Sequence, residues 1–520
     1  GTLMHKVSHV SSRRTLLGAT AATLAALATT RLPVAGRAAT AQEALASSLV
    51  IDLTAEPATL DPALTYDIDG WSVVHSVYDA PVQLGPGGVL QMVAAESLEQ
   101  IDPLTWELKL KPGLTFHNGE PLESSSVTFS VAHMQNPETA SQVAGNFAVV
   151  ESVEEVDDLT ARLHLSAPAP WLPSQLAPWI ALLPPAYAAD PANDFALNPV
   201  GTGPYVFKGW ERGSSIALER NPEYFGGDAK GAPIAEAVTF RFVQDGTTRV
   251  ADLLSGTSQI IGGVPLDQAP EVEASATMQA APVAGCAFVR VPNDVEPFTD
   301  PRVRQALNHA VDVEGIIASL LGGYGQRLAN FFVPNGMGFN ADLAPYAYDP
   351  ELAKSLLADA GYPDGFQTSM AISTLDRIDL GQAIAGQLAA VGIQTELQTV
   401  EIATFNGQWK DPEAAPLRLV SWRPVIDPYT LLSLLVSSSG FLSRYDDPEA
   451  QTLIDAAAVE PDTAKRVALY EQLGDVLFES PAGIYLWNRT AFYGSATDTP
   501  AWTQRPDEWL LPLLADATEG

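Results

Sequence analysis

Cysteine and histidine, which often act as nucleophiles, bases or metal ligands, are few in this sequence and stand apart from one another, and the 62 acidic residues are too many for any pair to be significant. It has one cysteine, Cys286, and seven histidines, and after residue 41 no two histidines stand at metal-ligand spacing. The flanking Ala284-Gly285 and Ala287-Phe288 offer no base that would activate the thiol. No phosphate-binding loop, nucleophile elbow or zinc-protease motif occurs. The sequence therefore favours a buried structural cysteine, excludes an intramolecular disulfide, and leads us to expect no enzyme centre, no metal and no cofactor.

Two further polar features have a functional and a structural interpretation. The acidic run Glu154–Asp158 could hold a metal, but its pattern is more typical of a hairpin with a polar turn. His117 lies in a segment rich in turn residues, and we expect it to pack or to form hydrogen bonds rather than to move protons. Arg302 and Arg304 are expected to face solvent or to cap a helix.

The overall charge restricts the partners of the chain. Against 28 basic residues stand 62 acidic ones, and the net charge of −34 opposes binding to nucleic-acid phosphates or anionic lipid. The 46% of hydrophobic residues can form a large core, and 520 residues exceed what one core usually organises. We therefore expect a globular protein of several domains with no nucleic-acid partner.

The first 41 residues have the composition of an export signal. They carry five basic residues and no acidic one, and the pair Arg13-Arg14 precedes a short apolar run from Gly18 to Thr30. This pattern resembles a twin-arginine (Tat) signal, and the small residues near Ala41 fit a cleavage site. No cysteine follows that could carry a lipid. We expect a mature periplasmic protein without a stable membrane anchor; a disordered basic arm is the alternative.

The elements that must position any site are strands in the first half and helices in the second. Trp106–Leu110, Ala161–Leu165 and Ile216–Leu218 alternate as half-buried strands. Asp300 and Pro301 have the types of a helix N-cap and first helical residue.

The same start recurs at Asp349-Pro350, where Leu352, Leu356 and Leu357 are expected to form the buried stripe and Gly361 to end the helix. A helical stretch ending at Gly392 then leads into an alternating strand. Together these units predict a mixed sheet flanked by helices.

An ordered series of segments resembles the family 5 (peptide/nickel type) solute-binding proteins of ABC importers. The segment from Leu110 to Leu122 (LKPGLTFHNGEPL) and the pair PVGTGPY (199–205) and LERNPEYFGG (218–227) carry most of the resemblance. Further matching segments, in chain order, are EPATLDP (56–62), VYDAPV (77–82), AAESL (94–98), DPRVRQAL (300–307), GGYG (322–325), YDP (348–350) and the region 422–432.

The resemblance implies an α/β fold, the two-lobed clamshell of periplasmic binding proteins (type II, cluster C) with an additional inserted domain. The expected parts are a signal peptide at 1–41, a discontinuous first lobe at 42–70, 200–285 and 487–520, an inserted domain at 71–199 and a second lobe at 286–486. Such a protein binds a solute between its lobes, closes over it and delivers it to an inner-membrane ABC permease. A monomer that catalyses no reaction is implied.

One departure from the family concerns recognition of the solute. In peptide-binding members, a tryptophan matching Trp422 is followed three positions later by an aspartate that pairs with the peptide's ammonium group, but this sequence has Val425 there. Asp427 could replace that aspartate, or it could cap the helix that begins near Pro428. Arg423 could bind an anionic group or stack on a ring, or it could form a surface salt bridge.

The remaining candidate ligand-binding residues are aromatic or polar. Trp422 offers a large flat contact face, with core packing as its alternative. Tyr66 follows the LDP segment, and Asn330, Phe331 and Trp171 are further candidates. The expected solute is a peptide or peptide-like molecule; an oligosaccharide, a metal chelate, a role as sensor or chaperone, and an exported hydrolase are the alternatives.

Overall fold

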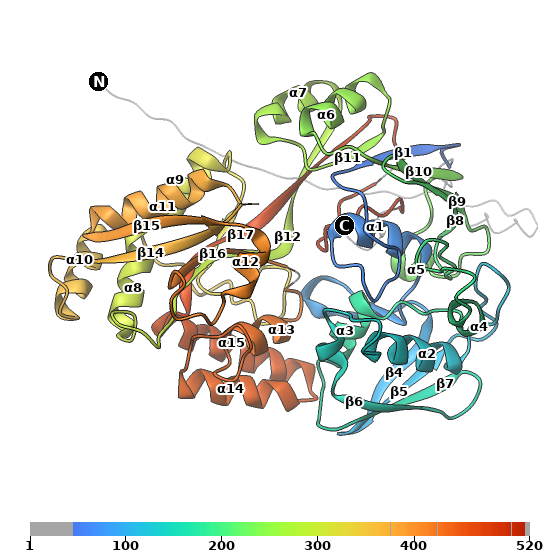
Figure 1. Ribbon diagram of the computed structural model, residues 1–520, viewed down its shortest axis with the longest axis horizontal. Helices are drawn as coiled ribbons and strands as arrows, with labels where there is room; N and C mark the ends of the chain where they lie inside the picture. Colours follow the sequence, from blue (N-terminus) through green and yellow to red (C-terminus); the bar gives the residue numbers. More distant parts are fainter. Residues whose placement is uncertain (1–44, 375, 424, 501, 515–520) are drawn as a thin grey trace, which may run out of the picture. The chain divides into compact units, whose positions relative to one another are not determined.

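The computed structural model describes residues 45–374, 376–423, 425–500 and 502–514, so the expected signal peptide lies outside the described residues. One mixed sheet of 11 strands runs in the order β15-β14-β16-β12-β17-β11-β1-β10-β9-β8, with β13 also pairing with β17 (Figure 1). The bounds are β1 Leu49–Leu53, β8 Tyr205–Glu211, β9 Ser215–Arg220, β10 Ala237–Phe242, β11 Ile260–Gly262, β12 Thr277–Arg290, β13 Gln326–Arg327, β14 Phe366–Ser373, β15 Ile393–Val400, β16 Leu417–Trp422 and β17 Gly483–Ser495.

Two long antiparallel strands, β12 and β17, connect the two ends of this sheet. The first half of β12, from Thr277, pairs with the last residues of β17, beside β11. The second half of β12, from Cys286 to Arg290, pairs with the first residues of β17 and on its other side with β16. The register shifts between Pro282 and Cys286, so the crossing strands are irregular at their middle.

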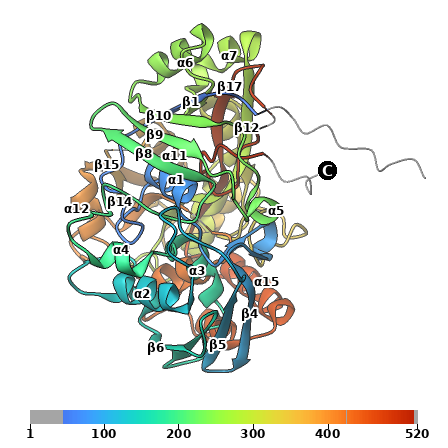
Figure 2. The same ribbon diagram turned by 90° about the vertical axis from the view of Figure 1, so that its right-hand side faces the viewer.

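A second sheet belongs to the segment 71–199. Its four strands run in the order β4-β5-β7-β6, and β2 and β3 form a separate hairpin. In Figure 2 this sheet lies at the opposite end of the view from α6 and α7. The bounds are β2 Val82–Leu84, β3 Leu90–Met92, β4 Ala95–Asp102, β5 Thr105–Leu110, β6 Val150–Glu155 and β7 Thr160–Leu165.

Two helices begin at the capping residues that the sequence predicts. The Asp300 carboxylate accepts from the backbone N–H of Arg302, and that of Asp349 from Leu352, with a proline at the first helical position in each case. Gly361 adopts φ +95°, a left-handed conformation that glycine adopts without strain. The α-helices are α1 Ile68–Val77, α2 Ser124–Gln135, α3 Leu172–Trp179, α4 Pro185–Ala189, α5 Gly227–Lys230, α6 Gly246–Ser255, α7 Ala269–Ser275, α8 Pro301–Ala310, α9 Val313–Leu320, α10 Pro350–Asp359, α11 Ile378–Ala390, α12 Ile402–Gly407, α13 Tyr429–Leu431, α14 Pro448–Val459 and α15 Thr463–Glu479.

Two expectations about these helices are wrong. Leu352 is 41% exposed and does not belong to the buried stripe of α10, whereas Leu357 is buried as expected, Leu356 packs against the same core, and Ala353 takes the place of Leu352. Arg304 does not face solvent: it is buried, and its guanidinium donates to the carbonyls of Phe298 and Pro481.

The buried hydrophobic residues form separate clusters. One cluster joins residues 49–240 to the tail residues 493–513, so the segment 71–199 shares a core with β1 and β10. Two clusters lie within residues 286–487, and a small one connects α6 and α7 to β11. The expected domain boundaries at 285/286 and 486/487 fall inside the continuous strands β12 and β17, and the division into domains stays a prediction.

Candidate functional site

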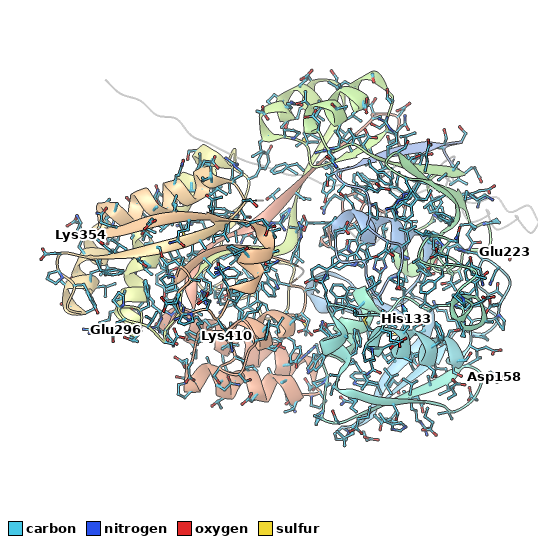
Figure 3. The ribbon with its side chains drawn as sticks, viewed as in Figure 1. His133, Asp158, Glu223, Glu296, Lys354 and Lys410 are labelled. Carbon is cyan, nitrogen blue, oxygen red and sulfur yellow. The ribbon has the colours of Figure 1, made fainter. Side chains whose placement is uncertain are left out.

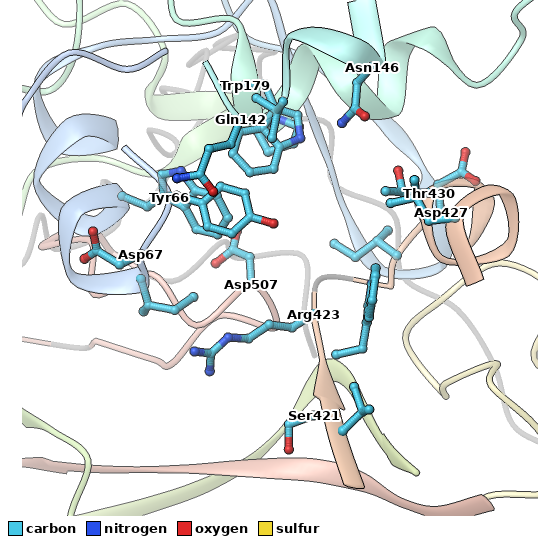
Figure 4. A pocket seen from close by; sticks show the side chains of 18 of the residues that line it. Tyr66, Asp67, Gln142, Asn146, Trp179, Ser421, Arg423, Asp427, Thr430 and Asp507 are labelled. Carbon is cyan, nitrogen blue, oxygen red and sulfur yellow. The ribbon is translucent and has the colours of Figure 1, made fainter. Parts of the chain in front are cut away.

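A cavity of about 780 Å³ lies between residues 66–179 on one side and residues 373–442 on the other. Residues of the crossing strand β17 and of the tail after it complete the lining. Figure 4 shows Tyr66, Asp507 and Arg423 in the middle of this space, with Asp427 and Thr430 beside the start of a helix. Three strands of the main sheet, β14, β16 and β17, therefore reach the same cavity.

Aromatic rings form the wall on the first side. Tyr66 stacks on Trp179 with 5.6 Å between ring centroids, and Trp71 meets Trp179 edge-on at 4.9 Å. Trp509 lies 6.1 Å from Trp71 and stacks on His75. Tyr66 remains 56% exposed, yet burial raises the pKa of its phenol, as expected for a ring inside a cavity. This wall offers flat apolar faces to a solute.

The opposite wall is carried by β16 and α12. Trp422 at the end of β16 and Phe405 and Trp409 from the α12 region line the cavity. Behind them lies Arg418, which is completely buried, donates to the carbonyls of Phe405 and Gln408, and has its guanidinium 4.1 Å from the Phe405 ring centroid. Arg418 therefore fixes the end of α12 against the sheet and holds the aromatic wall in place.

Asp427 is part of a closed ion pair. Its Oδ2 accepts from Arg466 Nη1 at 2.9 Å, and its Oδ1 accepts from the backbone N–H of Tyr429 at 3.0 Å. The Tyr470 hydroxyl lies 3.5 Å from Oδ1. Asp427 lines the cavity, and its bond to the Tyr429 N–H lies just before α13, whose N-cap is Pro428.

Arg423 and Arg489 share one carboxylate. Arg423 Nη1 lies 3.2 Å from both Glu508 oxygens, and Arg489 Nη1 lies 3.2 Å from Glu508 Oε2. The Glu508 side chain is 7% exposed, whereas that of Arg423 is 43% exposed. The next acid along the tail, Asp507, pairs with Arg505 at 2.7 Å. These charges meet where β16, β17 and the tail come together.

Direct contacts cross from one wall to the other beside the cavity. Trp171, just before α3, stacks on Tyr429 of α13 with 4.0 Å between ring centroids and planes 9° apart. Gln175 Nε2 donates to Thr430 Oγ1 at 3.1 Å. Because both contacts join residues 171–175 to residues 429–430, they hold the two sides of the cavity together.

The structure brings four of the seven residues expected from sequence to the cavity: Tyr66, Trp422, Arg423 and Asp427. The other three lie outside its lining. Phe331 is buried in the core beside Phe288, Asn330 accepts from the backbone N–H of Phe332 and donates to the carbonyl of Gly474, and Trp171 forms the stack with Tyr429.

Sequence reasoning missed the tail and the crossing strand. Arg489, Asp507 and Trp509 line the cavity from positions that no local pattern marks, because they reach it through pairing in the sheet and packing of the tail. Trp71 and Trp179 were also missed, although their size alone makes tryptophans candidates for a binding wall.

The two other polar features have structural roles. His117 Nε2 lies 3.0 Å from the Gly203 carbonyl oxygen, which joins the two strongest sequence motifs. Asp158 lies at the turn between β6 and β7, at the edge of the molecule in Figure 3. Within the described residues, no group of three or more metal-ligating side chains comes together, and no helix has the length and apolar character needed to cross a membrane.

Comparison with known proteins gives a consistent family. Residues 90–443 match the model described as bacterial extracellular solute-binding proteins, family 5 Middle. The glutathione-binding protein GsiB of Pectobacterium atrosepticum is 27% identical over 91% of this chain and 95% of its own. The structure of HbpA2 from Haemophilus parasuis superposes with a TM-score of 0.79 at 24% identity, covering 89% of this chain and 98% of that one. AgaA from A. tumefaciens R10, in complex with agropinic acid, gives 0.73 at 26% identity, with 89% and 96% covered.

Proposed function

Because the chain belongs to the bacterial extracellular solute-binding proteins of family 5, we propose that it captures a peptide-like solute in this cavity. Proteins of this family are the capture components of ABC importers, and their two-lobed fold agrees with the structure described above. We further propose that the mature protein works in the periplasm as a monomer, delivers its solute to an inner-membrane permease and releases it chemically unchanged.

The observation that carries the proposal is the cavity between two sets of elements. Its volume of about 780 Å³ lies within the usual range for sites that enclose small organic ligands and suits a peptide of two or three residues.

The similarity to GsiB makes glutathione, a tripeptide, the first solute to test. Because Trp422, Trp71, Trp179 and Trp509 line the cavity, tryptophan fluorescence reports its filling directly. We expect saturable quenching or enhancement at micromolar glutathione or trialanine. Replacing Trp422 by leucine should weaken binding by about tenfold, the effect of losing a central aromatic contact.

A matched control is Trp210→Leu, since Trp210 lies on β8 outside the cavity and should leave the affinity unchanged. No response to any di- or tripeptide at millimolar concentration, together with binding of a maltooligosaccharide or a nickel–histidine chelate, would replace the peptide proposal by one of those ligands. Recovery of a cleaved solute would make the protein an enzyme.

A further inference from the structure

The carboxylate best placed by sequence to bind a ligand's ammonium group is already occupied. Asp427 accepts from Arg466 on one oxygen and from the Tyr429 backbone on the other. The Arg466 side chain is only 8% exposed, so a ligand ammonium could reach Asp427 only by displacing a buried guanidinium. Removing one partner of a buried ion pair is strongly unfavourable. Asp427 therefore offers no free charge to the solute.

The other acids of the cavity wall are also engaged. Asp67 accepts from the backbone N–H of Gly70 at the start of α1, and Asp507 pairs with Arg505. Burial raises the pKa of the Asp376 carboxyl group, and a hydrogen bond from the Ser373 backbone and, more weakly, the charge of Arg489 oppose that rise. Each of these carboxylates accepts a hydrogen bond or ion pair from the protein, and Asp67, an exposed helix cap that meets no base, is the one whose second oxygen stays open to a cation.

The basic side of the cavity is different, because two guanidinium groups share the carboxylate of Glu508. Glu508 is the carboxylate that lies within 4 Å of both Arg423 and Arg489, and Asp376 adds a weaker attraction to Arg489 alone. Within the described residues, Glu508 is the only hydrogen-bond partner of Arg423, and it engages Nη1 alone. The Nε and Nη2 donors of Arg423 have no hydrogen-bond partner among the described residues. Together they form the edge of the guanidinium group that binds a carboxylate through two parallel hydrogen bonds.

The backbone of Glu508 gives a second, independent indication. Its φ of +68° lies in the left-handed region, which residues other than glycine adopt only when their surroundings impose it. The Tyr493 hydroxyl donates to the Glu508 carbonyl, and the Glu508 N–H donates to the carbonyl of Arg505. A strained residue held in this way, with its carboxylate buried under two arginines, is typical of a site that must present those arginines in a fixed position.

We propose that the solute carries a carboxylate that binds the free edge of Arg423 beside Arg489, and that recognition requires no ammonium group. Glu508 holds Arg423 in place, and the exposed face of Tyr66 packs against the part of the solute next to the carboxylate. Figure 4 shows Arg423 extending into the space beneath Tyr66 and Asp507. This inference rests on the proposed function, since it concerns the same cavity.

The test uses the full mature protein and one peptide in four forms. Trialanine is titrated calorimetrically as the free peptide, as the N-acetyl peptide, as the C-terminal amide and with both ends blocked, with glutathione beside it. We expect the free and N-acetyl forms to bind alike and the two amides to bind at least about tenfold more weakly, because they lose a charge-assisted pair of hydrogen bonds.

A pair of variants assigns the effect to Arg423. In Arg423→Gln, the acid and the amide should bind equally weakly. Arg162→Gln is the matched control, because Arg162 is similarly half-exposed and pairs with one carboxylate, Glu107, away from the cavity. It should keep the preference for the acid. The comparison of the four peptides on the unchanged protein holds even if Arg423→Gln does not fold.

Each other outcome overturns the inference in a distinguishable way. Equal binding of the acid and the amide by the unchanged protein shows that the protein does not recognise the carboxylate, and it leaves the proposed function intact. Loss of binding on N-acetylation shows that an ammonium anchor operates. An undiminished preference for the acid in Arg423→Gln shows that another residue binds the carboxylate. If neither glutathione nor any form of trialanine binds, the proposed function fails and the inference fails with it.

Discussion

Two ion-pair groups lie at the same cavity and differ in how completely their charges are satisfied. In the Asp427–Arg466 pair one acid meets one base, and the two side chains are 2% and 8% exposed. In the Glu508 group one buried acid meets two bases, and Arg423 is 43% exposed. The first group is closed to a solute and the second is open. A charged residue in a binding wall is therefore available to a ligand only where the protein leaves some of its charge and hydrogen-bond donors unused.

The largest effect should come from breaking the closed pair. Arg466→Met leaves Asp427 buried without its base, and we expect the free energy of unfolding to fall by about 3–5 kcal/mol. Urea denaturation followed by circular dichroism measures it. The double variant Asp427→Asn with Arg466→Met removes the orphaned charge and should recover part of the loss. A fall below about 1 kcal/mol would place this pair with ordinary surface salt bridges.

Asp52 on β1 is, like Asp427, a buried acid, but its pairing with a base is poor. Arg241 Nε lies 3.6 Å away, and Asp52 Oδ1 has no hydrogen-bond partner among the described residues. Burial raises the pKa of Asp52 from 3.8 to about 6, against the weaker opposing effects of Arg241 and Ser258. The surroundings of Asp52 in the folded protein therefore disfavour its charged form.

The sign of the pH effect follows from this shift. As pH rises from about 4 to about 6, the unfolded state loses its Asp52 proton before the folded state does, so the contribution of Asp52 to stability falls. Asp52→Asn should therefore raise the free energy of unfolding at neutral pH by up to about 3 kcal/mol, and the gain should vanish near pH 4. Denaturation at several pH values measures it, with the exposed Asp102→Asn as control. A gain that does not change with pH would contradict the assignment.

The sequence predicted the fold and four of the residues that line the cavity, and the reason that it missed the rest is physical. Helix starts such as Asp300-Pro301 depend on neighbouring residues, so the chain itself displays them. Whether Asp427 is open or closed depends on Arg466, 39 residues further along, and no local pattern joins them. The partner of Arg423 lies 85 residues away on the tail. Sequence could name both charged residues at the cavity, but not which one was satisfied.

The contacts that bridge the cavity form a third region, in which neutral groups join its two sides. The Trp171–Tyr429 stack is expected to favour the arrangement in which the walls are close, and thereby to slow release of the solute. Tyr429→Leu should lower the affinity by about fivefold, the effect of losing an aromatic pair, mainly through faster dissociation. Stopped-flow fluorescence measures it. Tyr348→Leu, at an exposed position outside the cavity, is the control, and an unchanged dissociation rate would show that the stack is only structural.

The smallest effect should be the change in the free energy of unfolding caused by Arg423→Gln. This variant removes one of the two bases that share Glu508. Because Arg489 stays on Glu508 when Arg423 is lost, the buried carboxylate keeps a base, and the free energy of unfolding should change by less than about 1 kcal/mol. The same substitution is expected to remove the preference for a carboxylate ligand. Urea denaturation measures the stability, with Arg466→Met beside it as the closed counterpart. A loss as large as that of Arg466→Met would mean that Glu508 needs both arginines, and the surplus of charge offered to the solute would then be absent.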